Sequence, residues 1–357
     1  MGTAAPARES PDRGAGVARR ACAAVPGRPK GECRSAPHEG RPVNSATTLP
    51  ALTALGLRRR GSDLLYTRRG LLMFGLLAPV LLWFGVIYLG SLLALLANAF
   101  FGLDDFTGQV VREFTLRNFV ALTQPANVDV AIRTVTMAVA VTIACTVLGF
   151  PLAYYMARHA RGAQKALLYI AVMLPLWSSY LVRLYAWKLL LAKEGAVSWL
   201  AGQLHATAVL EAVLAIPGIG GPSLSISNLG TFIVFVYMWL PFMVLPIMAA
   251  VERIPGSCIE ASGDLGAGPR ATFWNITLPL AMPGVAAGSI FTFSLTLGDY
   301  IIPQVIGNST LYIGQVVYRQ QGVAGNIPFA AAFSLVPIVV IALYLWFVKR
   351  RGAFDAL

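Results

Sequence analysis

Charged residues are scarce in this chain, and their scarcity excludes an ordinary soluble domain. Asp, Glu, Lys and Arg make up 12% of the 357 residues, whereas hydrophobic residues make up 57%. In soluble domains about a quarter of the residues are charged. The composition therefore predicts an integral membrane protein whose surface faces a lipid bilayer.

Lysine, histidine and cysteine are too few or too scattered for several kinds of site. None of the five lysines follows the glycines of a G-x-x-x-x-G-K-[S/T] sequence, so the chain lacks a P-loop for nucleotide phosphates. The three histidines form no Ser/His/Asp set by sequence, and the four cysteines include no C-x-x-C pair. We therefore expect no catalytic residues, metal site, disulfide or cofactor, and any ATPase must be another chain.

The basic charge is concentrated at the N-terminus. Residues 1–60 contain 11 Lys/Arg and 4 Asp/Glu, which accounts for much of the net charge of +12. They are rich in Ala, Gly, Pro and Arg and show little apolar periodicity, which predicts a disordered cytoplasmic extension. The first apolar run begins near Leu71 and is too long for a signal peptide. Charge confined to such a tail is weak evidence for nucleic-acid binding, and we expect none.

Six apolar segments are long enough to cross a bilayer, since a helix that spans the hydrocarbon core needs about 20 apolar residues. The stretch 207–220 is also apolar, but Pro217 and nearby glycines interrupt it, which predicts a short interfacial or re-entrant piece. The sequence thus predicts an all-α, polytopic membrane protein over residues 65–350. Its six transmembrane helices are expected near residues 71–96, 134–157, 166–190, 229–249, 284–306 and 328–348.

Basic residues near the ends of these segments predict the orientation. Thirteen Lys/Arg residues flank the spans on one side, and five flank them on the other. Because cytoplasmic loops carry the excess of Lys and Arg, both termini and the loop 251–283 are expected in the cytoplasm.

This loop, which we call the signature loop (residues 251–283), contains the sequence EASGDLGAGPRATFWNITLP at 260–279. It resembles the loop of permease subunits of bacterial ATP-binding cassette importers, whose pattern is E-A-A, three residues, G, nine residues, I, one residue, L-P. Ser262 stands where the second Ala is usual. The matching residues are Glu260, Ala261, Gly266, Ile276, Leu278 and Pro279.

The resemblance implies that the signature loop docks into an ATPase subunit and carries its closing motion to the membrane helices. Small residues permit close approach, and Gly266, Gly268 and Pro269 allow one short helix to end and another to begin. Glu260 is expected near the start of the first helix, where a negative charge is favourable. The residues expected to couple to the ATPase are Glu260, Ala261, Ser262, Gly263, Asp264, Leu265, Gly266 and Ala267.

Four other stretches are similar to the permease subunits of spermidine/putrescine importers. They lie at 174–195, 237–255, 278–307 and 326–334. The resemblance implies a type I ABC importer permease fold in the bacterial inner membrane. It also implies two ATP-binding cassette ATPase subunits, a second, related permease and a periplasmic or lipid-anchored solute-binding protein as partners.

Other functions remain open at this point. Permeases for sulfate, molybdate, ferric iron and thiamine share this ground plan, and another organic cation or an organic acid is also an alternative solute. An ion-coupled secondary transporter is a further alternative, but such proteins usually show repeated halves, and no convincing repeat is visible here.

Two charged residues fall inside expected spans, Arg183 in the third and Asp299 in the fifth. A charge at such a depth is costly unless it faces the interior of the bundle or a cavity. Asp299 could form a cation-favouring wall of the translocation path beside Tyr300, and Tyr180 and Trp187 could offer aromatic faces to amines. Alternatively, Arg183 and Asp299 pair with each other or with the backbone and only orient helices.

Prolines and small residues are expected to shape the spans. Prolines inside a span remove a backbone donor and permit a kink. They are Pro175, Pro241, Pro246 and Pro303. Small residues in the fifth span provide a face for close helix contact. They are Gly284, Ala286, Ala287, Gly288 and Ser289.

Overall fold

The computed structural model describes residues 69–104 and 107–350. The basic extension expected over residues 1–60 lies outside the described residues. The chain divides into two compact units, residues 1–77 and 78–357. Of the first unit, only the backbone of residues 69–77, which begins a helix, and the side chains from Met73 onward are described.

The described chain is mainly helical. Its two short strands, β1 (Gly102–Leu103) and β2 (Val110–Val111), pair antiparallel. The helices are α2 (Arg69–Leu82), the π-helical η1 (Trp83–Leu89), α3 (Gly90–Asn98), α4 (Arg117–Leu122), α5 (Pro125–Arg158), α6 (Gly162–Trp177), α7 (Tyr180–Leu190), α8 (Ala196–Gln203), α9 (Thr207–Leu214), α10 (Asn228–Glu252), α11 (Gly256–Asp264), α12 (Pro269–Thr272), the π-helical η2 (Phe273–Thr277), α13 (Leu278–Gly298), α14 (Ile301–Val305), α15 (Ile313–Gly322) and α16 (Ile327–Arg350).

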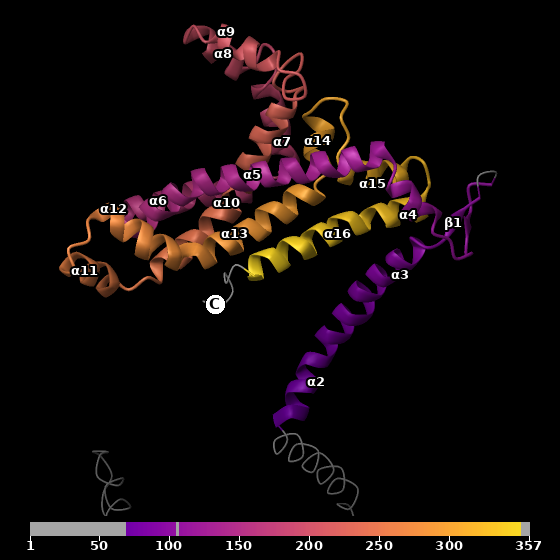
Figure 1. Ribbon diagram of the computed structural model, residues 1–357, viewed down its shortest axis with the longest axis horizontal. Coiled ribbons are helices and arrows are strands. Elements are labelled where there is room, and N and C mark those ends of the chain that lie inside the picture. The colour runs from indigo at the N-terminus through magenta and orange to yellow at the C-terminus, as the bar shows by residue number, and fades with distance from the viewer. Residues whose placement is uncertain (1–68, 105–106, 351–357) are drawn as a thin grey trace, which may run out of the picture. The chain divides into compact units, whose positions relative to one another are not determined.

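Helices α5, α10 and α13 pack side by side at the centre of the second unit (Figure 1). Glycines let α13 approach α10 closely, as expected for the small residues of the fifth span. A Cβ atom at Gly284 would lie 2.5 Å from the Cβ of Ala250, and one at Gly288 would lie 2.7 Å from the sulfur of Met243. No larger side chain fits at these two positions without displacing α10.

The third expected span, near residues 166–190, is not one continuous helix. It consists of α6 and α7, which meet at a bend of 99°. Ser178 and Ser179 between them have extended backbones, and the Ser178 hydroxyl donates a 2.9 Å hydrogen bond to the Pro175 carbonyl. The apolar pattern alone did not reveal this break, although Pro175 was expected to permit a kink. The described residues form five helices that can cross a membrane, or six if this bent pair is one span.

Two other spans differ in their limits from the sequence-based expectation. Helix α5 begins at Pro125, nine residues before the expected start at 134, and its first turns include Asp129 and Arg133, which pair at 2.5 Å four residues apart. The fifth span was expected over 284–306, but the helix begins before the signature loop ends and stops at Gly298. The stretch 207–220 contains only the eight-residue α9, as expected for a short piece.

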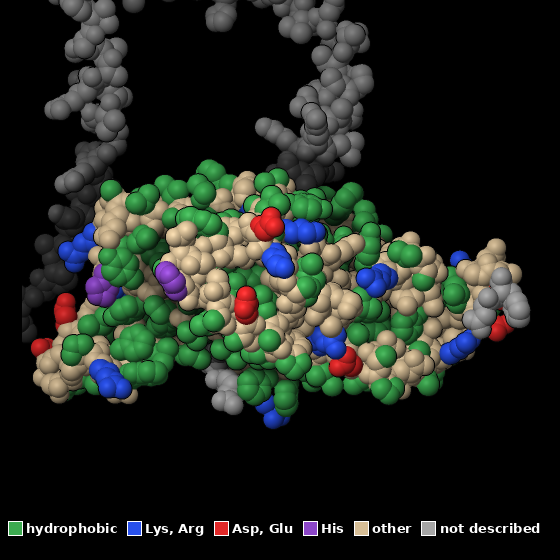
Figure 2. Space-filling view, turned by 90° about the horizontal axis from the view of Figure 1, so that it is seen from above, with side chains coloured by type: hydrophobic (Ala, Val, Ile, Leu, Met, Phe, Trp, Pro, Cys, Tyr) green, Lys and Arg blue, Asp and Glu red, His purple; other side chains and the backbone are tan. Residues whose placement is uncertain are grey.

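Hydrophobic side chains cover much of the exterior. On the long helices, Leu148 of α5 and Leu343 of α16 are more than half exposed. Figure 2 shows one face of the molecule, where charged side chains lie scattered among hydrophobic ones. A helical protein with such an exterior satisfies its backbone internally and can face hydrocarbon.

Candidate functional site

The signature loop forms two short helices, α11 and α12, at one end of the central bundle (Figure 1). Helix α11 ends at Asp264, and Gly266 then adopts a left-handed backbone with φ of +79°. Gly268 precedes α12, and Pro269 occupies its first turn. The expected division into two helices at Gly266, Gly268 and Pro269 is confirmed, since glycine allows the positive φ and proline suits a helix start.

Most residues expected to couple to the ATPase lie on the surface of this helix pair. Glu260, Ala261, Gly263, Asp264 and Gly266 are exposed. Leu265 is 89% exposed, the highest value among the large hydrophobic residues that the structure describes. Ala267 is half-buried. An exposed apolar tip flanked by small residues is a surface on which another protein could pack closely.

The position of Glu260 corrects one expectation. Helix α11 begins at Gly256, and its first turn contains no acidic residue. Glu260 therefore lies in the second turn, where the favourable interaction with the helix N-terminus has largely fallen off. The start of the helix was misplaced because Pro255, which sets its first residue, lies outside the stretch that carries the family pattern.

Ser262, the one departure from the family pattern, is only 4% exposed. Its hydroxyl lies 2.5 Å from the hydroxyl of Thr272 at the end of α12. The backbone N–H of Ala267 also donates to the Ser262 carbonyl at 3.0 Å. The Ser262 hydroxyl thus joins α11 to α12, a contact that alanine could not make, whereas the backbone hydrogen bond to Ala267 only closes the end of α11.

The residues expected along a path form one close cluster and several separate contacts. The Tyr180 hydroxyl donates a hydrogen bond to Asp299 Oδ2. Asp299 Oδ1 accepts from the backbone N–H groups of Ile301 and Ile302 at 2.7 and 3.1 Å. Asp299 follows the last residue of α13 and caps α14, so the carboxylate sits at a helix break and not within the fifth helix.

Arg183, Trp187 and Tyr300 do not share this cluster's hydrogen bonds. The described residues contain no ion pair between Arg183 and Asp299, and the buried Nε of Arg183 has no hydrogen-bond partner. Trp187 contacts Tyr237 of α10 at 5.0 Å between ring centroids. Tyr300 stacks on Tyr318 of α15 at 4.8 Å.

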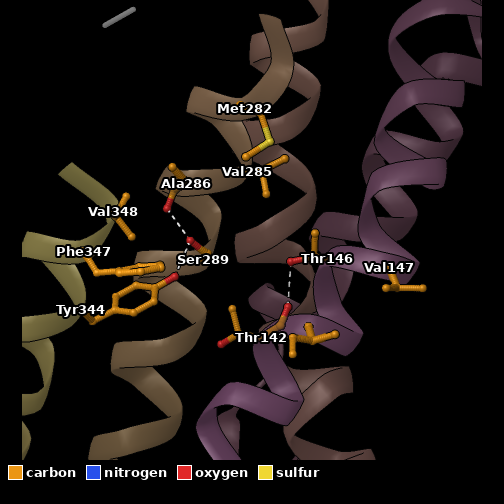
Figure 3. Close-up of a pocket in the computed structure, with 11 residues that line it drawn as sticks. Thr142, Thr146, Val147, Met282, Val285, Ala286, Ser289, Tyr344, Phe347 and Val348 are labelled. Atoms are coloured by element: carbon orange, nitrogen blue, oxygen red, sulfur yellow. Dashed lines mark hydrogen bonds between the residues drawn. The ribbon is translucent and has the colours of Figure 1, made fainter. Parts of the chain in front are cut away.

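A groove of about 570 Å³ opens between α5, α13 and α16 (Figure 3). Its walls are mainly apolar, and its hydroxyl groups bond to one another or to nearby carbonyls. The Tyr344 hydroxyl donates to Ser289 Oγ at 2.8 Å, and Thr146 donates to the carbonyl of Thr142 at 2.8 Å. None of the residues expected on the path lines this groove. The described residues also contain no group of three or more His, Cys, Asp and Glu that could hold a metal.

Comparisons with known proteins identify the family of the chain. Residues 149–352 match the family model of the binding-protein-dependent transport system inner membrane component. The chain is 59% identical over 288 residues to the inner membrane ABC transporter permease protein YdcU of Escherichia coli (strain K12), covering 81% of this chain and 92% of that protein. It is 31% identical over 258 residues to the spermidine/putrescine transport system permease protein PotB of the same organism, covering 71% and 88%.

The fold is that of solved type I ABC importers. A bacterial alginate ABC transporter, solved in complex with an alginate pentasaccharide-bound periplasmic protein, has a chain that matches with a TM-score of 0.60 and 16% identity. The match covers 81% of this chain and 96% of that chain. At this identity the likeness concerns the fold alone. The chain therefore belongs to the family of binding-protein-dependent transport system inner membrane components, and it is a multi-pass ABC importer permease, a transport subunit and not an enzyme.

Proposed function

We propose that this chain is the permease subunit of an ATP-driven importer of polyamines such as putrescine and spermidine. The observation that supports ATP-driven transport is the exposed α11–α12 pair of the signature loop, with small residues around the projecting Leu265. The pair suits a cleft in an ATPase subunit, and both chain termini would lie on the same, cytoplasmic side.

The assembly that we propose has two ATPase subunits, a second, related permease and a periplasmic or lipid-anchored solute-binding protein. Docking of the loaded binding protein outside and closure of the ATPases inside would open the path alternately to each side. Residues 260–267 would receive the ATPase motion, as the family pattern implies.

The polyamine assignment is supported by similarity to the spermidine/putrescine permease. It is also supported by a half-buried carboxylate, Asp299, with aromatic rings nearby. Tyr180 donates to Asp299 and stacks on Trp239 with ring centroids 6.4 Å apart. A carboxylate beside aromatic faces favours a cation. In this proposal Tyr180, Arg183, Trp187, Asp299 and Tyr300 line or shape the path.

Import of a different solute by the same machinery is the second candidate. The Asp299 carboxylate already accepts three hydrogen bonds, so its capacity for a cation is partly used. A relative that is 26% identical over 251 residues is a molybdenum transport permease of Mycobacterium bovis. In that case the solute would be the one selected by the cognate binding protein.

Uptake of radiolabelled putrescine and spermidine tests the proposal. The gene is deleted and then restored with its neighbouring transporter genes, and an ATPase-dead version serves as the control. Uptake that is lost on deletion and regained only with an active ATPase supports both parts of the proposal. Unchanged uptake in cells without another polyamine importer would reject the polyamine assignment, and ligand screening of the binding protein would then identify the solute.

A further inference from the structure

One face of α5 contacts both the entry and the exit of the signature loop. Phe150, Tyr154 and Arg158 follow one another at intervals of four residues near the end of α5. Residues at this spacing lie on the same side of a helix. We call these three residues the α5 stripe.

Two aromatic rings of the α5 stripe hold the exit of the signature loop. The ring of Phe273, which begins the π-helical turn η2, meets Phe150 and Tyr154 edge-on, each at 5.7 Å and 90°. Phe150 is buried, and Tyr154 and Phe273 are half-buried. Perpendicular ring pairs are a favourable and directional contact. The rings therefore fix where the chain leaves α12 and enters α13.

The third member of the α5 stripe holds the entry of the signature loop. Arg158 Nη2 donates a 2.9 Å hydrogen bond to the carbonyl of Ile254, between the end of α10 and the start of α11. Ile254 is buried, and the hydrogen bond is stronger than a neutral one because its donor is the charged guanidinium group. Lys165 of α6 and Glu252 also form an ion pair at 2.7 Å. Both side chains are about 40% exposed, and an ion pair exposed to solvent contributes little to stability.

Helix α5 also reaches the opposite end of the central bundle. It packs against both α10 and α13, and near its start the Thr134 hydroxyl accepts a 3.1 Å hydrogen bond from the backbone N–H of Ile313 at the start of α15. A packed helix held at both ends is a rigid element through which a displacement can travel.

We propose that the α5 stripe clasps the signature loop, so that α5 and the loop move as one body when the ATPases close. Phe150, Tyr154 and Arg158 are then positioning residues for transport, acting through the loop and not on the solute. The inference rests on the proposed docking of the signature loop to an ATPase, but not on the identity of the solute.

The test uses the complete transporter in nanodiscs, with the four native cysteines replaced by serine. Spin labels are placed at Leu148→Cys on α5 and at Asn275→Cys in η2, at the exit of the signature loop and outside the α11–α12 pair, and both positions are exposed. Their separation is measured without nucleotide and with ATP and vanadate. We expect the same separation in both states. A nucleotide-dependent shift in the otherwise unaltered transporter would overturn the clasp.

Variants then show whether the α5 stripe causes this behaviour. Arg158→Ala and Tyr154→Ala should make the separation depend on nucleotide, whereas Tyr154→Phe, which keeps the ring, should restore the constant value. Arg161→Ala removes the same charge from an exposed neighbouring position and should have no effect. Alanine variants that behave like the parent would refute the inference, as would a Tyr154→Phe variant that behaves like Tyr154→Ala.

A parallel measurement separates failure of the clasp from failure of the docking proposal. Co-purification of the ATPase with Gly266→Asp should fall about tenfold if the signature loop docks, because the added carboxylate would be buried without a partner in the interface. Normal co-purification would reject the docking proposal itself. Loss of co-purification for Gly266→Asp, together with unaltered separations in the α5 stripe variants, would reject only the clasp.

Discussion

The Tyr180 hydroxyl donates a hydrogen bond to the Asp299 carboxylate, and this contact joins the breaks of two helices. Tyr180 is the first residue of α7, directly after the 99° bend, and Asp299 directly follows Gly298, the last residue of α13. The second carboxylate oxygen holds the first turn of α14. One side chain therefore fixes the relative positions of α7, α13 and α14.

Removing the charge of Asp299 tests its proposed role in the path. In Asp299→Asn the amide oxygen can still accept from Ile301 and Ile302, but the NH₂ group cannot accept from Tyr180. We expect polyamine uptake to fall while the complex still assembles, and radiolabelled uptake per assembled complex measures this. Tyr180→Phe keeps the charge of Asp299 and removes the same hydrogen bond. A hydrogen bond to a charged group contributes about 1.5 to 3 kcal/mol to stability. If both variants transport normally, the contact only orients helices.

Gly266 is expected to tolerate no bulky charged residue. Its φ of +79° would cost most other residues roughly 1 to 2 kcal/mol but is tolerated by aspartate, so the decisive change is a carboxylate that projects from the proposed docking surface. We expect Gly266→Asp to abolish uptake while the protein remains in the membrane, as measured by uptake and by membrane immunoblot. Gly266→Asn is the matched control, because asparagine accepts the left-handed backbone without adding charge.

The charge of Glu260 offers a second probe of the same surface. Glu260 is exposed in the second turn of α11, so its replacement should leave the fold intact. We expect Glu260→Lys to abolish uptake without lowering the amount of protein in the membrane. Normal uptake by both Glu260→Lys and Gly266→Asp would contradict the coupling role of residues 260–267.

The crossing of α10 and α13 should be sensitive to small increases in volume. A valine at Gly284 would place its Cβ 2.5 Å from the Cβ of Ala250 and 2.6 Å from the Pro246 carbonyl oxygen. Overpacking of this kind costs about 1 to 3 kcal/mol, so we expect Gly284→Val to lower the thermal unfolding temperature in detergent. Gly202→Ala in α8, where nothing lies within 4 Å of an added Cβ, should not lower it.

The Ser262 hydroxyl should stabilise the signature loop without being required for transport. We expect Ser262→Ala to retain uptake, because alanine is usual at this position of the family pattern. The loss of the hydrogen bond to Thr272 should cost about 1 kcal/mol. A double-mutant cycle with Thr272→Val, read by thermal unfolding, isolates this contact; additive effects would show that the hydroxyls are not coupled.

Local patterns in the sequence were sufficient to predict the membrane class and the two helices of the signature loop. Apolar length identifies a span, and Gly266 and Pro269 mark where one helix stops and the next begins. The limits of the spans were less predictable. A count of apolar residues ends the span at Asp129 and Arg133, whereas α5 continues through both charged residues to Pro125.

Contacts between distant segments could not be predicted in the same way. Arg158 and Ile254 are 96 positions apart, and nothing local to either residue indicates the other. The sequence placed Arg183 and Asp299 inside spans and left their pairing open, whereas the structure gives Asp299 a tyrosine and two backbone amides as partners. Such partners depend on how helices cross, which the periodicity of one helix does not specify.

The break between α6 and α7 has a consequence for hydration. Ser178 and Ser179 have extended backbones and exposed side chains, so the peptide groups beside them lie outside the regular helical ladder. In hydrocarbon each unsatisfied peptide group costs several kcal/mol. This side of the broken span must therefore face water or another protein chain and not lipid tails. The bend thus marks where the membrane domain meets water or a partner chain instead of lipid.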